Sequence, residues 1–341
     1  MNRLSSLLNI AHPIVQGPFG GGISRVELAA AVSNAGGLGS FGAHILSPSD
    51  IRDVVLAIRA QTPSPFSVNL WVPQPGEDES IDLAPHIARL APLYERLGVD
   101  WAGEIEAAPD FDAQLESLLE VAPPSISFVM GLPPKWAVER AKKKKIVLIG
   151  TATTVAEARA VEAWGLDAVV ASGSDAGGHR GAFLKPVAES LVGTFSLVPQ
   201  IVDAVGIPVI AAGGIADRRG ILAAHALGAD GVQIGTGFLA TTESGASDIH
   251  RDKLASSDAE TTVLTRLFSG RHARGIVNSL IRELSTEEDG VPPYPIQNAW
   301  MQPLRKAAAQ RGESDYLNLW AGQAAPLTRR LSAAEYFESL L

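Results

Sequence analysis

The strongest constraint on the fold of this chain is a regular alternation of short apolar runs with longer helical patterns over residues 1–240. Alternation of this kind is typical of parallel strands joined by crossover helices. Eight such units predict an α/β protein, a (β/α)8 TIM barrel, although a doubly wound open sheet would share most of the local signals. The expected strands span residues 13–16, 38–41, 66–71, 126–130, 146–149, 168–171, 208–212 and 231–234.

The alternation is lost after Leu239. Residues 241–290 are polar and helix-prone, which predicts a small helical insertion lobe over the mouth of the barrel. Residues 291–341 begin with a proline-rich return, and we expect them to form C-terminal helices that pack back on the barrel. The insertion carries four arginines that we expect on solvated helix faces, with contact to a substrate left open: Arg251, Arg266, Arg271 and Arg274.

Length and composition bound the class of protein. With 341 residues, 46% of them hydrophobic and 19% charged, the chain can bury one large core together with a small lobe. Its net charge of −9 argues against binding to nucleic acid or to an acidic membrane surface, because both need concentrated positive charge. The basic run 142–145 precedes an apolar strand, so we interpret it as a solvated helix end.

The chain contains no cysteine. Disulfides, thiolate nucleophiles and cysteine-ligated metals are thereby excluded, and a reducing, cytoplasmic compartment fits best. No apolar run approaches the roughly eighteen residues needed to span a bilayer. The apolar stretch 4–10 leads directly into the first expected strand, so we interpret it as part of the folded protein and not as a signal peptide.

One loop concentrates the candidate chemistry. The expected strand 168–171 runs into the sequence Gly-Ser-Asp-Ala-Gly-Gly-His-Arg-Gly (173–181), whose glycines let the backbone approach a ligand closely. In this loop His179 is the side chain that could exchange a proton near neutral pH without a large pKa shift. We predict that His179 is a catalytic base, because loops at strand ends carry barrel chemistry. The alternative is that His179 only ties the loop to the strand ends.

Two further glycine-rich loops, 211–215 and 233–237, follow the last two expected strands. Barrels often bind phosphate at this place, and backbone N–H groups backed by a helix N-terminus suit a dianion. The candidate residues are Gly213, Gly214, Gly235 and Thr236. Either loop alone could owe its glycines to the steric needs of a strand-to-helix turn.

Short motifs spread along nearly the whole chain match those of one enzyme family. They are Pro-Ile-Val-Gln (13–16), Asn-Ala-Gly-Gly-Leu-Gly (34–39), Ser-Val-Asn (67–69), Asp-Ala-Gly-Gly-His-Arg-Gly (175–181), Ala-Gly-Gly-Ile (212–215), Gln-Ile-Gly-Thr (233–236), Pro-Ile-Gln-Asn (295–298) and Leu-Trp-Ala-Gly-Gln (319–323). With these motifs the chain resembles the nitronate monooxygenases, formerly called 2-nitropropane dioxygenases.

The resemblance implies a barrel that binds FMN without a covalent bond. It also implies that alkyl nitronates, or neutral nitroalkanes, are oxidised with O2 to a carbonyl compound and nitrite, with no metal. His179 matches the family's catalytic base, which would take the α-proton of a neutral nitroalkane. The implied flavin-binding residues, including those of the anion pocket, are Asn69, Gly177, Gly178, Gly213, Gly214, Gln233, Gly235 and Thr236.

Three positions depart from the family pattern. Ser172 stands where glutamine is frequent, Asp175 where glutamate is commoner, and Phe19 where methionine is usual. The first change would shorten the reach of a hydrogen bond to the flavin ring, and the last would alter the shape beside it. They leave the substrate open, so a bulkier or aromatic nitro compound remains an alternative.

The nearest alternative function is an FMN-dependent reductase of the enoyl- or quinone-reductase type, which would oxidise NAD(P)H on the same barrel. The chain has no Rossmann fingerprint, but such barrels bind the dinucleotide without one. A barrel of the IMP dehydrogenase type is disfavoured because its covalent step needs a cysteine. A Schiff-base lyase is disfavoured because Lys135 and Lys185 lie beyond the strands.

Other readings of the polar residues are weaker. A metal site at Asp175 and His179 would need a helix between them, which Gly177 and Gly178 disfavour. The histidines at positions 12, 44, 86, 225, 250 and 272 are interpreted as structural, and whether any of them lines the barrel mouth is left open. A purely scaffolding role is the last alternative. The oligomeric state is also open, and a homo-oligomer is compatible with the sequence.

Overall fold

Eight parallel strands form a barrel in the computed structural model, which describes residues 2–74, 82, 84–101 and 108–341. Their hydrogen-bonded order is β1-β9-β8-β6-β5-β4-β3-β2, and a parallel bridge from Val15 in β1 to Leu38, just before β2, closes the circle. The TIM barrel is therefore confirmed, and the open-sheet alternative is wrong. The strands are β1 (Ile14–Gln16), β2 (Gly39–Gly42), β3 (Phe66–Trp71), β4 (Ser125–Val129), β5 (Val147–Ala152), β6 (Ala168–Ser172), β8 (Val209–Ala212) and β9 (Gly231–Ile234).

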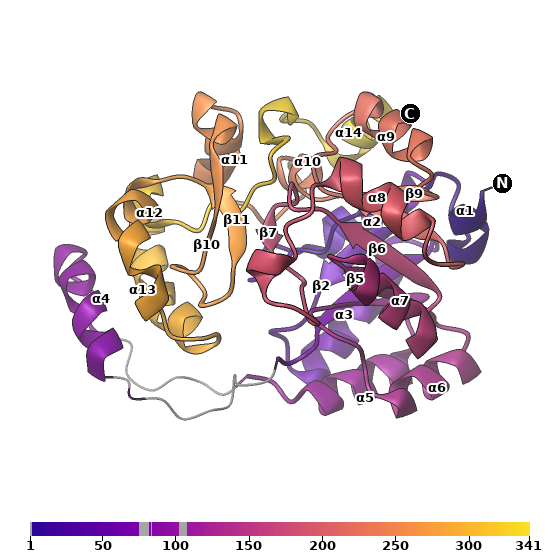
Figure 1. Cartoon of the computed structure of the whole chain (residues 1–341), viewed down its shortest axis with the longest axis horizontal. Coiled ribbons are helices and arrows are strands. Elements are labelled where there is room, and N and C mark those ends of the chain that lie inside the picture. The colour runs from indigo at the N-terminus through magenta and orange to yellow at the C-terminus, as the bar shows by residue number, and fades with distance from the viewer. Residues whose placement is uncertain (1, 75–81, 83, 102–107) are drawn as a thin grey trace.

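Helices cover the outside of the barrel (Figure 1). They are α2 (Val26–Asn34), α3 (Pro48–Gln61), α5 (Phe111–Val121), α6 (Lys135–Lys143), α7 (Val155–Trp164), α8 (Thr194–Val202), α9 (Arg218–Ala226) and, from the C-terminus, α14 (Ala333–Ser339). Helix α7 begins after Thr154, whose side chain caps it by accepting the N–H of Glu157. The exposed lysines 142–145 lie at and beyond the end of α6, as expected.

Ser24 and Glu27 have the spacing of a capping box but do not form one. Helix α2 begins after Arg25, which makes no side-chain cap. The Ser24 hydroxyl instead donates to the carbonyl of Phe19 (2.8 Å) and accepts the N–H of Gly42 (2.8 Å). Ser24 therefore ties the first loop to the end of β2, which holds that loop at the barrel mouth.

The N-terminal helix α1 (Arg3–Leu8) packs into the floor of the barrel. Leu4 and Leu8 are buried in one cluster with side chains from inside the barrel, among them Val170 and Ile210. Gly231 leaves room for Leu4, since a Cβ at Gly231 would lie 2.4 Å from a Leu4 methyl carbon. The apolar stretch at the start of the sequence is thus part of the core.

A second lobe stands beside the barrel mouth (Figure 1). Its hydrophobic cluster contains Leu90, Phe268 and Trp300, so it joins segments that lie far apart in the sequence. The insertion is helical only in part, because it also contains a two-stranded hairpin. The elements of this lobe are α4 (Ala84–Arg96), α11 (Asp248–Leu254), β10 (Thr262–Thr265), β11 (Ala273–Ile276), α12 (Ser279–Leu284) and α13 (Ile296–Arg311).

A short strand, β7 (Gly178–His179), connects the lobe to the barrel. It leaves the loop after β6 and pairs antiparallel with β11, with His179 opposite Ala273 and Gly178 opposite Arg274. The glycine-rich loop therefore becomes the third strand of the hairpin sheet. This pairing fixes the backbone of His179 between the two parts of the molecule.

The expectation that the insertion arginines lie on solvated helix faces is wrong for three of them, because Arg266, Arg271 and Arg274 lie outside the helices. Arg274 lies on β11 with 8% of its surface exposed, and its Nε donates to the carbonyl of Ser174 (2.8 Å). The guanidinium of Arg271 lies over the rings of Trp71 and Tyr294. Both arginines face the barrel because this part of the insertion forms a hairpin.

Within the residues that the structure describes, no helix combines the length and the hydropathy that a membrane span requires.

Candidate active site

A cavity of about 1210 Å³ lies between the carboxyl ends of the barrel strands and the second lobe. Its volume exceeds the roughly 300–1,000 Å³ that is typical of small-molecule pockets, so it can hold a cofactor and a substrate together. Every residue that the sequence predicted for the site lines this cavity: Asn69, Gly177, Gly178, His179, Gly213, Gly214, Gln233, Gly235 and Thr236. The fold thus brings together residues from four barrel strands, β3, β6, β8 and β9, or from the loops that follow them.

The charge of the cavity differs from that of the whole chain. Although the net charge is −9, the described residues that line the cavity include no aspartate and no glutamate. The lining carries two basic side chains, Arg305 and Lys306. A cavity of this composition favours anionic molecules.

The two glycine-rich loops form a cradle for an anion. Helix α10 (Thr236–Leu239) begins after Gly235 without a side-chain cap, and no acceptor among the described residues takes the N–H of Gly214 or Thr236. The neighbouring helix starts are already occupied: Asp217 caps α9, and Asp175 accepts the N–H of Thr194 in α8 (2.6 Å). The cradle after β8 and β9 is therefore the place where a phosphate would find free donors.

Two glycines of the cavity wall keep space open for a ligand. An added Cβ at Gly178 would meet no protein atom within 4 Å, and at Gly235 it would come no closer than 3.9 Å to Phe19. A side chain at either position would therefore project into the cavity and not into the protein. The wall and the free backbone donors fit a phosphorylated cofactor such as FMN.

Asn69 and Gln233 offer side-chain amides to the cavity. The Asn69 Nδ2 donates to the Ser127 carbonyl (3.1 Å) and hydroxyl (3.0 Å), which leaves Oδ1 as an acceptor. Gln233 has no side-chain partner among the described residues, although it lines the cavity. Both amides are thus available to hydrogen-bond a ligand that carries donors and acceptors around its ring.

His179 presents one ring nitrogen to the cavity. Its Nε2 lies 2.9 Å from the Ser269 hydroxyl, and that hydroxyl donates to the Arg271 carbonyl (3.1 Å). Because the serine proton is used on the carbonyl, the serine oxygen accepts from Nε2–H. The lone pair is then on Nδ1, which has no partner among the described residues. The imidazole is therefore oriented as a proton acceptor through Nδ1.

Burial, followed by the charges of Arg271, His44 and Arg305, lowers the pKa of His179 from 6.5 to about 3. The imidazole is consequently neutral over the whole physiological pH range. The sequence suggested a histidine that titrates near neutrality without a large shift, and this expectation is wrong because the lobe buries the ring and places arginines beside it.

Aromatic side chains surround His179, and the sequence analysis missed them. Trp71 and Trp320 both contact the imidazole edge-on, with ring centroids 4.8 Å and 5.4 Å away. His44 stacks in parallel on Trp71 at 3.7 Å. Trp71 ends β3, so the rule that strand ends carry function could have found it. Ser269 gave no local signal, because only tertiary pairing brings it to His179.

The three departures from the family pattern fall in different places. Phe19 and Ser172 line the cavity, so both side chains can contact a bound ligand. The carboxylate of Asp175 points instead to the start of α8. Since His179 faces Ser269, the side chains of Asp175 and His179 do not converge, and the structure gives no geometry for a shared metal ion.

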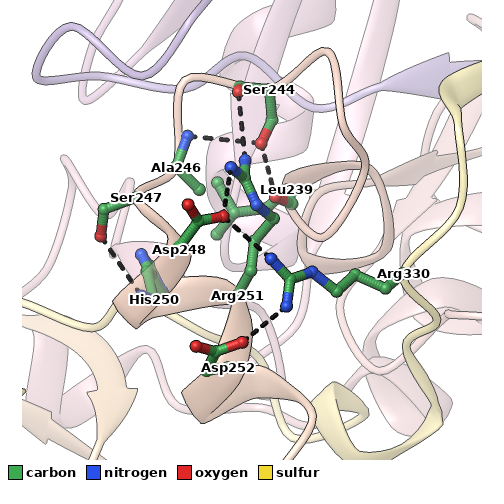
Figure 2. A network of polar contacts seen from close by, with 9 residues as sticks. All are labelled: Leu239, Ser244, Ala246, Ser247, Asp248, His250, Arg251, Asp252 and Arg330. Atoms are coloured by element: carbon green, nitrogen blue, oxygen red, sulfur yellow. Dashed lines mark hydrogen bonds and ion pairs between the residues drawn. The ribbon is translucent and has the colours of Figure 1, made fainter.

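His250 also lines the cavity, a question that the sequence left open for this histidine. Its Nε2 donates to the carbonyl of Trp320 (3.1 Å), which fixes the backbone next to that indole. Figure 2 shows how α11 is held: Arg330 donates to Asp248 (2.9 Å) and Asp252 (2.6 Å) on that helix. The C-terminal segment thereby anchors one wall of the cavity.

Comparisons with known proteins agree with this site. The family model described as nitronate monooxygenase matches residues 1–341. A probable nitronate monooxygenase of Staphylococcus aureus (strain JH9) is 44% identical over 324 residues, which cover 94% of this chain and 91% of that protein. The solved structure of a nitroalkane oxidase from Streptomyces ansochromogenes is similar with a TM-score of 0.92 and 39% identity, covering 99% of this chain and 96% of that chain. FabK from Thermotoga maritima is similar with a TM-score of 0.78 and 31% identity, covering 100% of this chain and 94% of that chain.

These matches run along the whole chain, and they agree with the barrel and with the glycine-lined cavity at its mouth. The chain therefore belongs to the nitronate monooxygenase family, and it is a flavin-dependent oxidoreductase that acts on small molecules.

Proposed function

We propose that this enzyme binds FMN and oxidises alkyl nitronates, and neutral nitroalkanes after removal of a proton, with O2 to a carbonyl compound and nitrite. The observation that carries the proposal is the neutral His179, whose unpartnered Nδ1 faces a cavity lined by no carboxylate among the described residues. Such a site suits a reaction in which the substrate is, or becomes, an anion.

The cavity wall supplies the groups that would hold FMN. The backbone N–H groups of Gly214 and Thr236 would bind its phosphate at the uncapped start of α10. The amides of Asn69 and Gln233 would hydrogen-bond its polar groups. When bound, FMN would supply the electron acceptor for the nitronate and the site of reaction with O2.

His179 has a role only when the substrate is the neutral nitroalkane. Nδ1 would take the α-proton, and the imidazolium formed would stand beside the nitronate anion that it has created. A histidine with a pKa of about 3 is a weak base in isolation, but the adjacent anion favours its protonated form in the transition state. A preformed nitronate needs no such step.

Absorbance and anaerobic mixing test the proposal. We expect a yellow purified protein whose flavin is bleached by ethylnitronate in the absence of O2, with nitrite appearing when O2 is admitted. Bleaching by NADPH and not by ethylnitronate would support the alternative, an enoyl- or quinone-reductase type of enzyme. A colourless protein that FMN does not reconstitute would overturn both.

Two coarser expectations remain part of the proposal. We propose that the enzyme works in the reducing cytoplasm, because the chain has no cysteine that could form a disulfide. The division into a barrel (1–240), an insertion lobe (241–290) and C-terminal helices (291–341) stays a prediction about segments of the sequence, although α4 and α13 pack in the second lobe, and limited proteolysis of the holoenzyme would test it. The oligomeric state can be measured by light scattering.

A further inference from the structure

The surroundings of His179 bear on which nitro compounds can react. Its Nε2 faces Ser269, and the indoles of Trp71 and Trp320 contact its ring, both with their planes inclined by more than 60° to it (61° and 64°). Both indoles line the cavity. An alkyl group that is bonded to the reacting α-carbon must therefore enter beside these two rings when the α-proton approaches Nδ1.

Trp71 is held in place from several sides. It stacks on His44 with the two planes only 3° apart and the centroids 3.7 Å apart. The guanidinium of Arg271 lies 5.4 Å from its ring centre, and the ring of Tyr294 is 5.9 Å away. Such contacts each stabilise one orientation of the indole.

The loop between β1 and α2, which contains Gly20, packs against another side of Trp71. An added Cβ at Gly20 would lie 2.7 Å from His44 Cε1 and 3.2 Å from Trp71 Cζ2. The loop backbone is thus packed against both rings, and the indole has no space to swing toward it. Trp71 is a fixed wall and not a mobile gate.

Trp320 forms a second fixed wall. Its ring packs edge-on against Phe268 at 5.7 Å, and its carbonyl accepts from the ring Nε2–H of His250. Ala321, the next residue, donates its backbone N–H to the carbonyl of Arg274 (3.2 Å). The ring is therefore fixed from the lobe side, while Trp71 is fixed from the barrel side.

We infer that Trp71 and Trp320 are specificity-determining residues that limit the alkyl group of the substrate to small groups. This inference rests on the proposed function, since it assumes that the α-carbon reacts at Nδ1 of His179. It differs from the expectation, open at the level of sequence, that bulkier or aromatic nitro compounds are accepted. A rigid pocket discriminates a single methylene by roughly 10- to 200-fold, so two immobile indoles suffice for strong selection.

The test compares nitroethane with nitrocyclohexane as substrates of the holoenzyme. For the wild type we expect kcat/KM to be higher for nitroethane by at least about tenfold. In Trp71→Leu the ratio of kcat/KM for nitrocyclohexane to that for nitroethane should rise by about tenfold or more, with a smaller rise in Trp71→Phe. Trp136→Phe, a half-buried tryptophan on α6 outside the cavity, is the matched control and should leave the ratio unchanged.

A binding measurement separates the inference from the proposed reaction. Carboxylates are planar, unreactive mimics of nitronates, so the dissociation constants of propanoate and cyclohexanecarboxylate can be read from changes in the flavin spectrum. Trp71→Leu and Trp320→Leu should both gain affinity for cyclohexanecarboxylate relative to propanoate. Thermal unfolding identifies any variant that fails to fold, in which case Trp71→Phe and Trp320→Phe decide the matter.

The outcomes are distinguishable. If folded Trp71 and Trp320 variants keep the wild-type size preference in both turnover and carboxylate binding, the inference is overturned. If the wild type selects small carboxylates, and loses this selectivity in the variants, yet oxidises no nitro compound, the indole walls are supported and only the proposed function fails.

Discussion

The burial of His179 predicts an unusual pH dependence for the oxidation of a neutral nitroalkane. Because kcat/KM reports ionisations of the free enzyme, its acid limb should follow the pKa of the base. That pKa is lowered to about 3, first by burial and then by Arg271. We therefore expect kcat/KM for nitroethane to show no fall due to His179 between pH 7 and pH 5.

The size of the effect follows from the fraction of neutral imidazole. With a pKa of about 3, roughly 99% of the base is unprotonated at pH 5, whereas an ordinary histidine with a pKa of 6.5 would be only about 3% unprotonated. Because the lowered pKa disfavours protonation of the imidazole, the base stays neutral and active until the pH falls toward 3. An ordinary histidine would instead cost about thirtyfold at pH 5 relative to its fully neutral form.

The assay is the initial rate of nitrite release from nitroethane at low concentration, measured from pH 5 to pH 7 at constant ionic strength. Arg271→Met supplies the internal comparison, because removing this positive charge should raise the pKa of His179 and move the acid limb upward. Ethylnitronate, which needs no deprotonation, is the control substrate. A wild-type profile that declines about 25-fold from pH 7 to pH 5 with nitroethane alone would refute the reasoning.

Three further predictions concern the base, the cradle and the fold. His179→Asn should keep its flavin but lose most turnover with nitroethane while sparing ethylnitronate, and an equal loss on both substrates would count against the base assignment. Gly235→Ala should weaken FMN binding by about tenfold, measured by flavin fluorescence, without lowering the melting temperature of the apoprotein, because its Cβ would meet only the cavity. Gly290→Ala, outside the cavity lining and equally unhindered, is its control. Glu157→Ala should destabilise the protein by about 3 kcal/mol or more in urea unfolding, since the fully buried carboxylate accepts the N–H groups of Thr153, Phe183 and Leu184. A loss below about 1 kcal/mol would show that these groups find other partners.

The barrel could be predicted because each of its strands has a local sequence pattern. The apolar run 168–171 and the glycines after it mark a buried strand and a loop at its carboxyl end, and β6 spans Ala168–Ser172. The cradle was equally accessible, since Gly214 and Gly235 follow two consecutive barrel strands. In both places the signal and the structure lie within a few residues of one another.

The second lobe could not be predicted in the same way. Its cluster joins Leu90 to Phe268 and Trp300, and no local pattern relates residues so far apart. Strand β10 reads Thr-Val-Leu-Thr, whose β-branched residues favour a strand, but it is only four residues long and lies in a segment that is otherwise polar and helix-prone. What was missed about His179, namely its hydrogen bond to Ser269 and its low pKa, depends on this tertiary packing.

The barrel and the second lobe contribute different parts of the site around His179, so the barrel alone does not complete it. The barrel supplies the cradle of Gly214 and Thr236, which would serve any phosphorylated cofactor at the same place. The lobe supplies Ser269, which leaves the lone pair on Nδ1, and it lowers the pKa of His179 first by burying the ring and then through the charge of Arg271. Since the strand pairing of β7 with β11 brings these groups to His179, a change in the hairpin would alter proton transfer while leaving the cradle intact. Differences in chemistry among barrels with the same cradle are therefore expected to arise in the lobe and not in the glycine loops.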